Sequence, residues 1–218
     1  MKVLVIDVGG SHIKVLATGQ NVPIKIPSGP AMTARTMVRR VREAVDGWTY
    51  DAVSIGYPGV VLHGKPVSEP RNLGGGWVGF AFKRAFGRPV IVINDAAMQA
   101  LGSYKGGRML FLGLGTGLGS ALIIDGVLEP MELAHLPYKN GRTYEDYVGS
   151  AGLKRLGKKK WRRHVVDVVT RLKAALEADD VVIGGGNAKL LHRLPPGVRP
   201  GANANAFLGG YRLWKAHA

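Results

Sequence analysis

The chain has 218 residues, of which 46% are hydrophobic, and this length is enough for one large domain or two small lobes. It contains no cysteine, which excludes disulfides, thiolate metal sites and cysteine nucleophiles. The 30 Lys and Arg residues outnumber the 15 Asp and Glu residues, so the formal net charge of +15 favours a polyanionic partner.

The charge excess leaves three alternatives open: nucleic acid, inorganic polyphosphate, or a solvated surface without a partner. No apolar stretch of the sequence is long enough to span a membrane, and the first residues lack the pattern of a signal peptide. We therefore expect a cytoplasmic protein without a membrane segment.

In the first half of the chain, apolar runs and turn residues predict strands alternating with helices. Strands are expected at 3–8, 13–18, 21–26, 52–55 and 89–93, with a short hairpin over 60–67. Helices are expected at 31–46, with Thr33 near the start, at 78–86, ending at Gly87, and at 95–104.

The turn between the first two expected strands carries the first candidate site. Gly9 and Gly10 let the backbone turn tightly, so that its N–H groups can form a nest for phosphate oxygens, with the Ser11 hydroxyl beside them. Asp7 can hold a magnesium ion, and Lys14 can neutralise phosphate charge. A simple hairpin with a capping Asp and an edge Lys explains the same residues equally well.

Asn94 and Asp95 end an apolar strand and open a helix. In open α/β sheets, ligands bind beyond the carboxyl ends of the strands, where an acid can accept a proton from a hydroxyl and an amide can orient that hydroxyl. The alternative is a helix N-cap, which Asn and Asp favour strongly.

The second half repeats the pattern of the first. Strands are expected at 108–113, 118–124 and 181–183. Helices are expected at 143–149, 158–178 and 204–215. The order strand, glycine turn, strand occurs at 3–18 and again at 108–124, which predicts two similar α/β lobes with a cleft between them. The expected lobes are 1–94 and 95–202, with the last helix, about 203–218, returning to the first lobe.

The glycine turn over 113–119 differs from a dinucleotide-binding fingerprint, because its spacing is wrong and a strand follows it. It fits a hairpin nest in which Thr116 offers a hydroxyl to a phosphate. A glycine-rich hairpin in a crowded core is the open alternative.

Glu132, His135 and Glu145 suit hydrogen bonds to neighbouring hydroxyls of a sugar. The alternatives are a first-turn helix acid for Glu145 and a hydrogen-bonded loop imidazole for His135. We expect no zinc site, because the chain lacks cysteine and its six histidines are scattered.

Two features lie near the end of the chain. The run Gly184–Gly186 follows a buried strand and either opens a helix whose N-terminus binds an anion or makes a tight turn. Before it, a basic run surrounds Trp161 without an acid, and we expect it to be a polyanion surface, with a solvated helix face as the alternative. This surface comprises Lys158, Lys159, Lys160, Arg162 and Arg163.

Taken in order, these motifs resemble those of the ROK family of sugar kinases, and within it the branch that uses polyphosphate to phosphorylate glucose. The segment Asp7–Lys14 resembles the family's first phosphate loop. The other motifs follow in the family's order at 56–59, 94–95, 113–119, 132–135 and 184–186.

The resemblance implies an actin-like fold with two ribonuclease-H-like lobes, and Mg²⁺-dependent phosphoryl transfer from ATP or inorganic polyphosphate to a hexose. By position, Asp95 would be the catalytic base. The sugar would be held by Asn72, Asn94, Asp95, Glu132, His135 and Glu145. The donor would be held by Asp7, Gly9, Gly10, Ser11, Lys14, Gly115, Thr116, Gly117, Gly185 and Gly186.

We also expect a homodimer that binds no nucleic acid. An ATP-only kinase for another hexose, or a non-catalytic polyanion- or nucleic-acid-binding protein on this fold, stays open as an alternative. The chain departs from the family in three ways: it lacks the cysteine zinc motif of many members, Ala134 stands where Gly is usual, and the segment after Gly186 is short.

Overall fold

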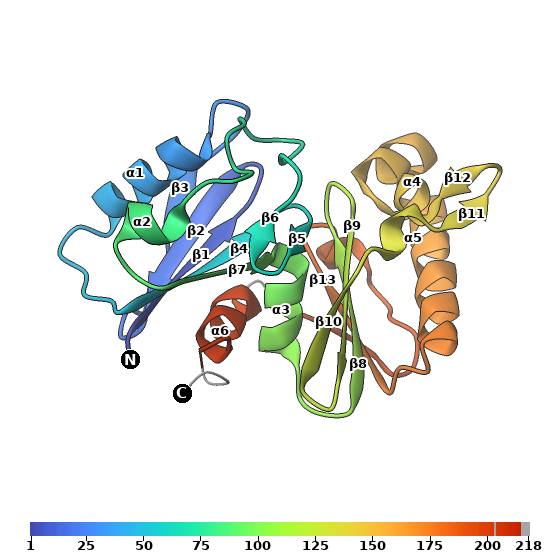
Figure 1. Cartoon of the computed structure of the whole chain (residues 1–218). Coiled ribbons are helices and arrows are strands. Elements are labelled where there is room, and N and C mark those ends of the chain that lie inside the picture. Colours follow the sequence, from blue (N-terminus) through green and yellow to red (C-terminus); the bar gives the residue numbers. More distant parts are fainter. Residues whose placement is uncertain (203, 215–218) are drawn as a thin grey trace. The chain divides into compact units, whose positions relative to one another are not determined.

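The computed structural model of the chain describes residues 1–202 and 204–214 (Figure 1). The chain divides into two compact units. Met1–Met98 and the segment that begins at Ala206 form the first unit, and Gln99–Asn205 form the second.

The division between the units falls inside helix α3 (Asp95–Ser103), a little after the expected boundary at Asn94. Met98 belongs to the first unit because it packs in one apolar cluster with Val3 and with Phe207 of α6 (Asn205–Arg212). The last helix was expected over 204–215; residue 203 and residues 215–218 lie outside the described residues.

The first unit is built on a five-stranded sheet in the order β3-β2-β1-β4-β7. The strands are β1 (Val3–Val8), β2 (His12–Ala17), β3 (Ile24–Pro27), β4 (Ala52–Tyr57) and β7 (Val90–Asn94). The first three strands form an antiparallel meander, and β4 and β7 continue the sheet in parallel to β1. Every residue of β1 and β4 is buried, as expected for central strands covered on both faces.

Two helices and a short hairpin connect the strands of the first unit. They are α1 (Ala34–Ala44), the hairpin of β5 (Val61–Leu62) and β6 (Lys65–Pro66), and α2 (Phe82–Phe86). As the sequence predicts, Thr33 caps α1: its hydroxyl oxygen accepts from the N–H of Thr36 at 3.1 Å. Gly87 ends α2 in a left-handed conformation, with φ of 66°.

The second unit contains a five-stranded sheet in the order β10-β9-β8-β13-β14. The strands are β8 (Arg108–Leu114), β9 (Leu118–Ile124), β10 (Val127–Met131), β13 (Asp180–Gly184) and β14 (Val198–Pro200). An antiparallel meander of three strands is again continued by two parallel strands. The predicted structural repeat is therefore confirmed at the level of strand order and direction.

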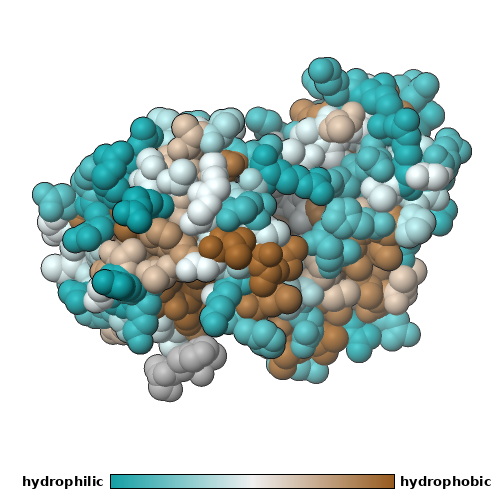
Figure 2. All heavy atoms as spheres, turned by 45° about the horizontal axis from the view of Figure 1, so that its top comes forward, coloured by the Kyte–Doolittle hydropathy of each residue, from teal (hydrophilic) through white to brown (hydrophobic). Residues whose placement is uncertain are grey.

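The remaining elements of the second unit lie between β10 and β14. They are the 3₁₀ turn η1 (Leu133–His135), β11 (Pro137–Lys139), β12 (Arg142–Thr143), α4 (Tyr144–Val148), α5 (Ser150–Ala175) and the 3₁₀ turn η2 (Ala188–Leu190). The Trp161 side chain of α5 is fully buried, and its indole N–H donates to the Val148 carbonyl at 2.8 Å. The α4–α5 end of this unit is covered largely by hydrophilic side chains (Figure 2).

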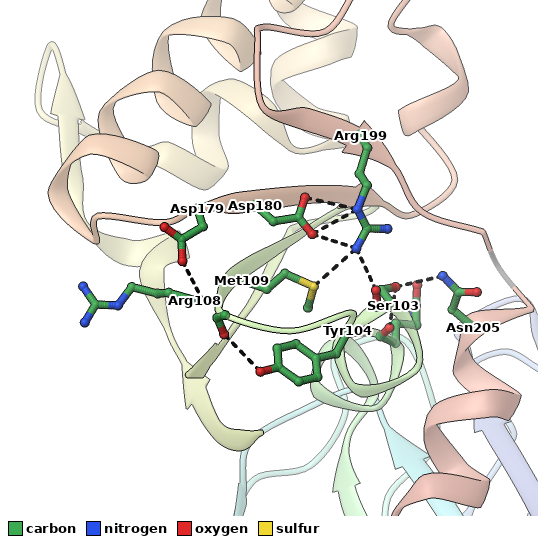
Figure 3. Close-up of polar contacts among 10 residues, drawn as sticks. Ser103, Tyr104, Arg108, Met109, Asp179, Asp180, Arg199 and Asn205 are labelled. Carbon is green, nitrogen blue, oxygen red and sulfur yellow. Dashed lines mark hydrogen bonds and ion pairs between the residues drawn. The ribbon is translucent and has the colours of Figure 1, made fainter. Parts of the chain in front are cut away.

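The start and end of the second unit are joined by polar contacts around Arg199 of β14 (Figure 3). Its guanidinium pairs with Asp180 at 2.7 Å and donates to the Ser103 carbonyl, also at 2.7 Å. The Asn205 amide donates to the Ser103 hydroxyl at 2.9 Å, so the residue that ends α3 and the residue that begins α6 contact each other.

Some sequence-based element limits are confirmed and others are wrong. The expected helix start at 158 is confirmed, because Gly157 interrupts α5 with φ of 71° and ψ of 160° and a second helical segment begins at Lys158. The helical segment from Ser150 to Leu156 before this kink was missed. Helix α2 begins at Phe82 and not at 78, because the Val78 N–H is held by the Glu69 carboxylate. Strand β10 was missed because its Glu-Pro pair breaks the apolar pattern, but an edge strand tolerates proline.

None of the helices in the described parts of the chain has the length and apolar character needed to cross a membrane.

Candidate active site

An ion pair in the first unit joins the two strands that flank the first glycine turn. Asp7 of β1 and Lys14 of β2 are partners in the antiparallel register, and Lys14 Nζ lies 3.2 Å from Asp7 Oδ2. The Asp7 side chain is 10% exposed, whereas that of Lys14 is 31% exposed. The pair therefore presents a cation toward solvent above a nearly buried carboxylate.

Asp95 is the first residue of α3, and its carboxyl group interacts electrostatically with both members of this pair. One carboxylate oxygen, Oδ1, accepts from the Ala96 N–H at 2.8 Å. The other, Oδ2, accepts no hydrogen bond from any other described residue and still reaches solvent. Burial raises the pKa of Asp95 to about 7, with a further rise from the negative charge of Asp7 and a partial offset from Lys14. At neutral pH the carboxyl group can therefore take up or release a proton.

Asn94 has the N-cap role that was the alternative for the Asn94–Asp95 pair. Its side-chain oxygen accepts from the N–H groups of Ala96 at 2.9 Å and Ala97 at 3.2 Å, and its amide donates to the Gly59 carbonyl at 3.1 Å. The cap fixes the start of α3 and, with it, the backbone that carries Asp95. Asn94 keeps one free amide hydrogen at most for a ligand.

The first glycine turn is tight and is held from outside. The Gly9 N–H donates to the His12 carbonyl at 3.1 Å, and a Cβ at Gly9 would lie 2.8 Å from the same oxygen, so only glycine fits. The Ser28 hydroxyl donates to the Gly9 carbonyl at 2.6 Å. Gly10 and Ser11 are exposed at the tip of the turn.

Asn72, predicted to assist in sugar binding, lies against this turn: a Cβ at Gly10 would be 3.2 Å from the Asn72 Cβ. The loop that carries Asn72 is closed by two residues that the sequence analysis missed. The Glu69 carboxylate accepts from the Trp77 N–H at 3.1 Å, and the buried Trp77 indole donates to the Gly74 carbonyl at 2.7 Å.

In the second unit, the glycine turn between β8 and β9 contacts the start of α5. The Ser150 N–H donates to the carbonyls of Gly115 and Thr116, each at 3.1 Å. The Thr116 side chain is exposed. A Cβ at Gly117 would overlap the Glu145 carboxylate, so a side chain there would displace that carboxylate.

Of the two alternatives for the run Gly184–Gly186, the structure shows the tight turn, and only the short η2 turn follows it. Gly185 has φ of 84° and packs against the Leu114 backbone, which leaves no room for a side chain. Asn187, missed by the sequence analysis, donates from its side-chain amide to the Gly115 carbonyl at 3.0 Å. The third glycine segment therefore touches the second.

The predicted sugar residues of the second unit lie in two places. Glu145 points toward the glycine turn, where its Oε2 accepts from the Leu118 N–H at 3.2 Å. Glu132 directly precedes η1 and His135 is its last residue, with Glu132 Oε1 3.6 Å from His135 Nδ1, and both side chains are more than half exposed. The carboxylate and the imidazole are thus adjacent and available to a ligand.

The basic run of α5 spreads around the helix. Lys158, Lys159, Lys160 and Arg163 are exposed, as the sequence predicts. Arg162 is half-buried, because its guanidinium donates to the Leu190 carbonyl at 2.6 Å.

Comparisons with known proteins agree with the order of these motifs. The model of the ROK family matches residues 3–129, which is more than half of the chain. The chain belongs to the ROK family. The polyphosphate glucokinase of Mycobacterium tuberculosis (strain ATCC 25618 / H37Rv) is 30% identical over 213 residues, a match that covers 88% of this chain and 80% of that protein.

Solved structures of ROK proteins share the fold. The inorganic polyphosphate/ATP-glucomannokinase from Arthrobacter sp. strain KM matches with a TM-score of 0.80 and 24% identity, covering 100% of this chain and 99% of that one. A ROK family glucokinase from Streptomyces griseus, in complex with glucose and AMPPNP, matches with a TM-score of 0.78 and 17% identity over 98% of this chain and 99% of that one. The predicted family and the actin-like α/β fold class are both confirmed.

Proposed function

We propose that the chain is a glucokinase-type phosphotransferase, which transfers a phosphoryl group from polyphosphate or ATP to a hexose, with glucose giving glucose 6-phosphate. The names of the mycobacterial and Arthrobacter relatives support this acceptor and these donors. Within the chain, one observation carries the proposal: Asp95, with its pKa raised to about 7, lies in the electrostatic field of the Asp7–Lys14 pair.

Asp95 acts as the general base. A carboxylate whose pKa lies near the working pH accepts a proton more readily than an ordinary Asp, whose pKa is about 4. The hexose hydroxyl transfers its proton to Asp95 Oδ2 as its oxygen bonds to phosphorus, and the donor leaves with the electrons of the broken P–O bond. Most of the rate enhancement comes from positioning and electrostatics, as in other phosphoryl transfers.

The residues that we assign to the sugar are described for each unit by itself. Asn72 comes from the loop beside Gly10, and Glu132, His135 and Glu145 come from the second unit. Carboxylate, amide and imidazole groups suit hydroxyls because each can accept or donate a hydrogen bond. Asn94 contributes mainly by capping α3 under Asp95.

In each unit, the groups that we assign to phosphate are the N–H groups of the glycine turns, with Lys14 beside the turn of the first unit. Those turns comprise Gly9, Gly10 and Ser11 in the first unit, and Gly115, Thr116, Gly117, Gly185 and Gly186 in the second. Turns of this kind make concave anion sites without a side-chain charge.

Mg²⁺ fits this arrangement as a cofactor. It commonly binds through one or two carboxylates, donor phosphates and water, and Asp7 offers one carboxylate beside the phosphate turn. In the described parts of the chain, no three His, Asp or Glu side chains form a metal cluster. When bound, the ion would neutralise charge on the phosphates.

A coupled assay for glucose 6-phosphate, run in parallel with ATP and polyphosphate on several hexoses, tests the proposal. We expect glucose to be phosphorylated, with polyphosphate used at least as well as ATP, because the net charge of +15 favours a long polyanion. Absence of phosphorylation with every pair, together with tight nucleic-acid binding, would instead favour a non-catalytic polyanion-binding protein. A homodimer and a cytoplasmic location stay predictions.

A further inference from the structure

Two segments of the second unit contain no acidic residue. The first runs from Tyr147 to Val166 and includes the first turns of α5. The second begins at Val181, after which the sequence contains no further Asp or Glu. The first segment concentrates seven lysine and arginine residues, and the second contributes Lys189 and Arg193. Neither segment has a carboxylate of its own, although Arg199 in the second pairs with Asp180 just before it.

The structure brings the two segments together at the second glycine turn. The side-chain amide of Asn187 donates to the Gly115 carbonyl at 3.0 Å and to the Ser150 hydroxyl at 3.1 Å. Ser150 is the first residue of α5, and Asn187 directly follows the three glycines. Both acid-free segments therefore contact the Gly115–Gly117 turn, which is part of the donor site proposed above.

The segments are tied together again farther along α5. Arg162 donates from Nε to the Leu190 carbonyl at 2.6 Å, and its Nη2 lies 2.7 Å from His192 Nε2. Three helical turns later, Lys173 on the same flank of α5 donates to the Pro196 carbonyl at 3.1 Å. This flank of α5 therefore lies along residues 187–196. The contacts of Arg162 with Leu190 and His192 fix the position of the second segment against the helix.

Exposed lysine and arginine side chains on either side of Arg162 are available to bind an anion. Lys158, four residues before Arg162 and so on the same flank, is exposed, as are Lys159, Lys189 and Arg193. The side chains of these four residues form no hydrogen bond or ion pair with another described residue. Because these positive charges are not paired within the chain, they can bind an anionic ligand from solution.

We propose that these two segments form one track for the distal part of a long polyphosphate chain, which starts at the Gly115–Gly117 turn and passes over Lys158, Lys159, Lys189 and Arg193. This inference rests on the proposed function, because it assumes that the donor's reacting end lies at the glycine turns. We call this surface the α5 track.

A long donor gains more from the α5 track than a short one. Each phosphate that meets a lysine or arginine releases counterions, so binding by many weak contacts is steeply salt-dependent. ATP and tripolyphosphate carry only three phosphates, so they make fewer such contacts than a long chain does. The track therefore selects for donor length, while the chemical step stays the same.

The test compares two double variants with equal loss of charge. Lys189→Ser with Arg193→Ser removes two cations of the track. Lys105→Ser with Arg142→Ser removes one lysine and one arginine that are also exposed in the second unit but lie outside α5 and 187–196. The readouts are KM for ATP, tripolyphosphate and long polyphosphate, and direct binding of long polyphosphate by calorimetry across a salt series.

We expect the track variant to weaken binding of long polyphosphate on the order of fivefold to tenfold and to lower its salt slope by roughly one to two units. Its KM for ATP, tripolyphosphate and glucose should match wild type, and the control variant should match wild type throughout. An equal loss in the control, or an equal loss for tripolyphosphate, would overturn the track. If wild-type protein phosphorylates no hexose with any donor, the proposed function fails instead, and the calorimetric comparison still tests the track as a binding surface.

Discussion

Lys14 and Asp7 face each other across the antiparallel pair β1–β2, with Lys14 Nζ 3.2 Å from Asp7 Oδ2. The two charges act on Asp95 in opposite directions: Asp7 raises its pKa and Lys14 lowers it. The sequence predicts these residues for phosphate and metal binding, but their geometry gives them a second effect on the proposed base. The first predictions concern that effect.

Asp95→Asn should lose about 10²–10⁴-fold in kcat, because an amide cannot accept the hydroxyl proton. The variant should fold, since Asn is also accepted at a helix start. The raised pKa of Asp95 means that ionising this carboxyl costs the folded state free energy at pH above 7. At pH 8 the variant should therefore melt at or above the wild-type temperature, and the difference should vanish below pH 4. Near-wild-type turnover would remove Asp95 from the mechanism.

The pH profile should follow Asp95 and respond to Asp7. The base works only when ionised, so kcat/KM should fall as pH drops below about 7. Asp7→Asn removes a negative neighbour, so the pKa of Asp95 should fall and the acid limb should move to lower pH. The ¹³C carboxyl titration of Asp95, followed by NMR, measures the same shift independently of activity. An unchanged midpoint would show that the charge of Asp7 does not act on Asp95.

The exposed pair Glu132 and His135 should act on the sugar. Glu132→Gln and His135→Ala should each raise KM for the hexose more than KM for the donor, because these groups are assigned to hydroxyls. Steady-state kinetics with each substrate varied in turn separate the two effects. A selective loss of donor affinity would place this pair at the phosphates.

Substitutions at Gly117 and Glu145 should have effects that do not add. Gly117→Ala adds a methyl group where the Glu145 carboxylate now lies, so the carboxylate must move away from the Leu118 N–H. Gly117→Ala and Glu145→Gln should each raise KM for the hexose, and the double variant should be little worse than either single variant. Additive losses would mean that the two residues act separately.

Local signals in the sequence predict much of the fold. Thr33 marks the start of α1 because its hydroxyl caps the helix, and Gly87 marks the end of α2 because it takes a left-handed conformation. Elements shaped by distant contacts were missed. The start of α5 is fixed by the hydrogen bonds of Ser150 to Gly115 and Thr116, which no local pattern encodes.

The same distinction between local signals and distant contacts holds for the candidate site. The Asp7–Lys14 pairing follows from the alternation of one hairpin, and Asn94–Asp95 follows from a strand that runs into a helix. The contact of Glu145 with Gly117 joins residues far apart in sequence. The closing of the Asn72 loop by Glu69 also depends on tertiary packing, so the sequence analysis did not predict it.

The two sheets put different chemistry at equivalent positions. In β1–β2 the second pair from the turn is Asp7 with Lys14, and in β8–β9 it is Gly113 with Gly119. The parallel neighbour is glycine in both, Gly56 beside Asp7 and Gly184 beside Gly113. The second pair from the turn in one hairpin can be either two opposite charges or two glycines without side chains, but not both. Two copies of the same topology let one half specialise in charged side chains while the other offers only its peptide groups.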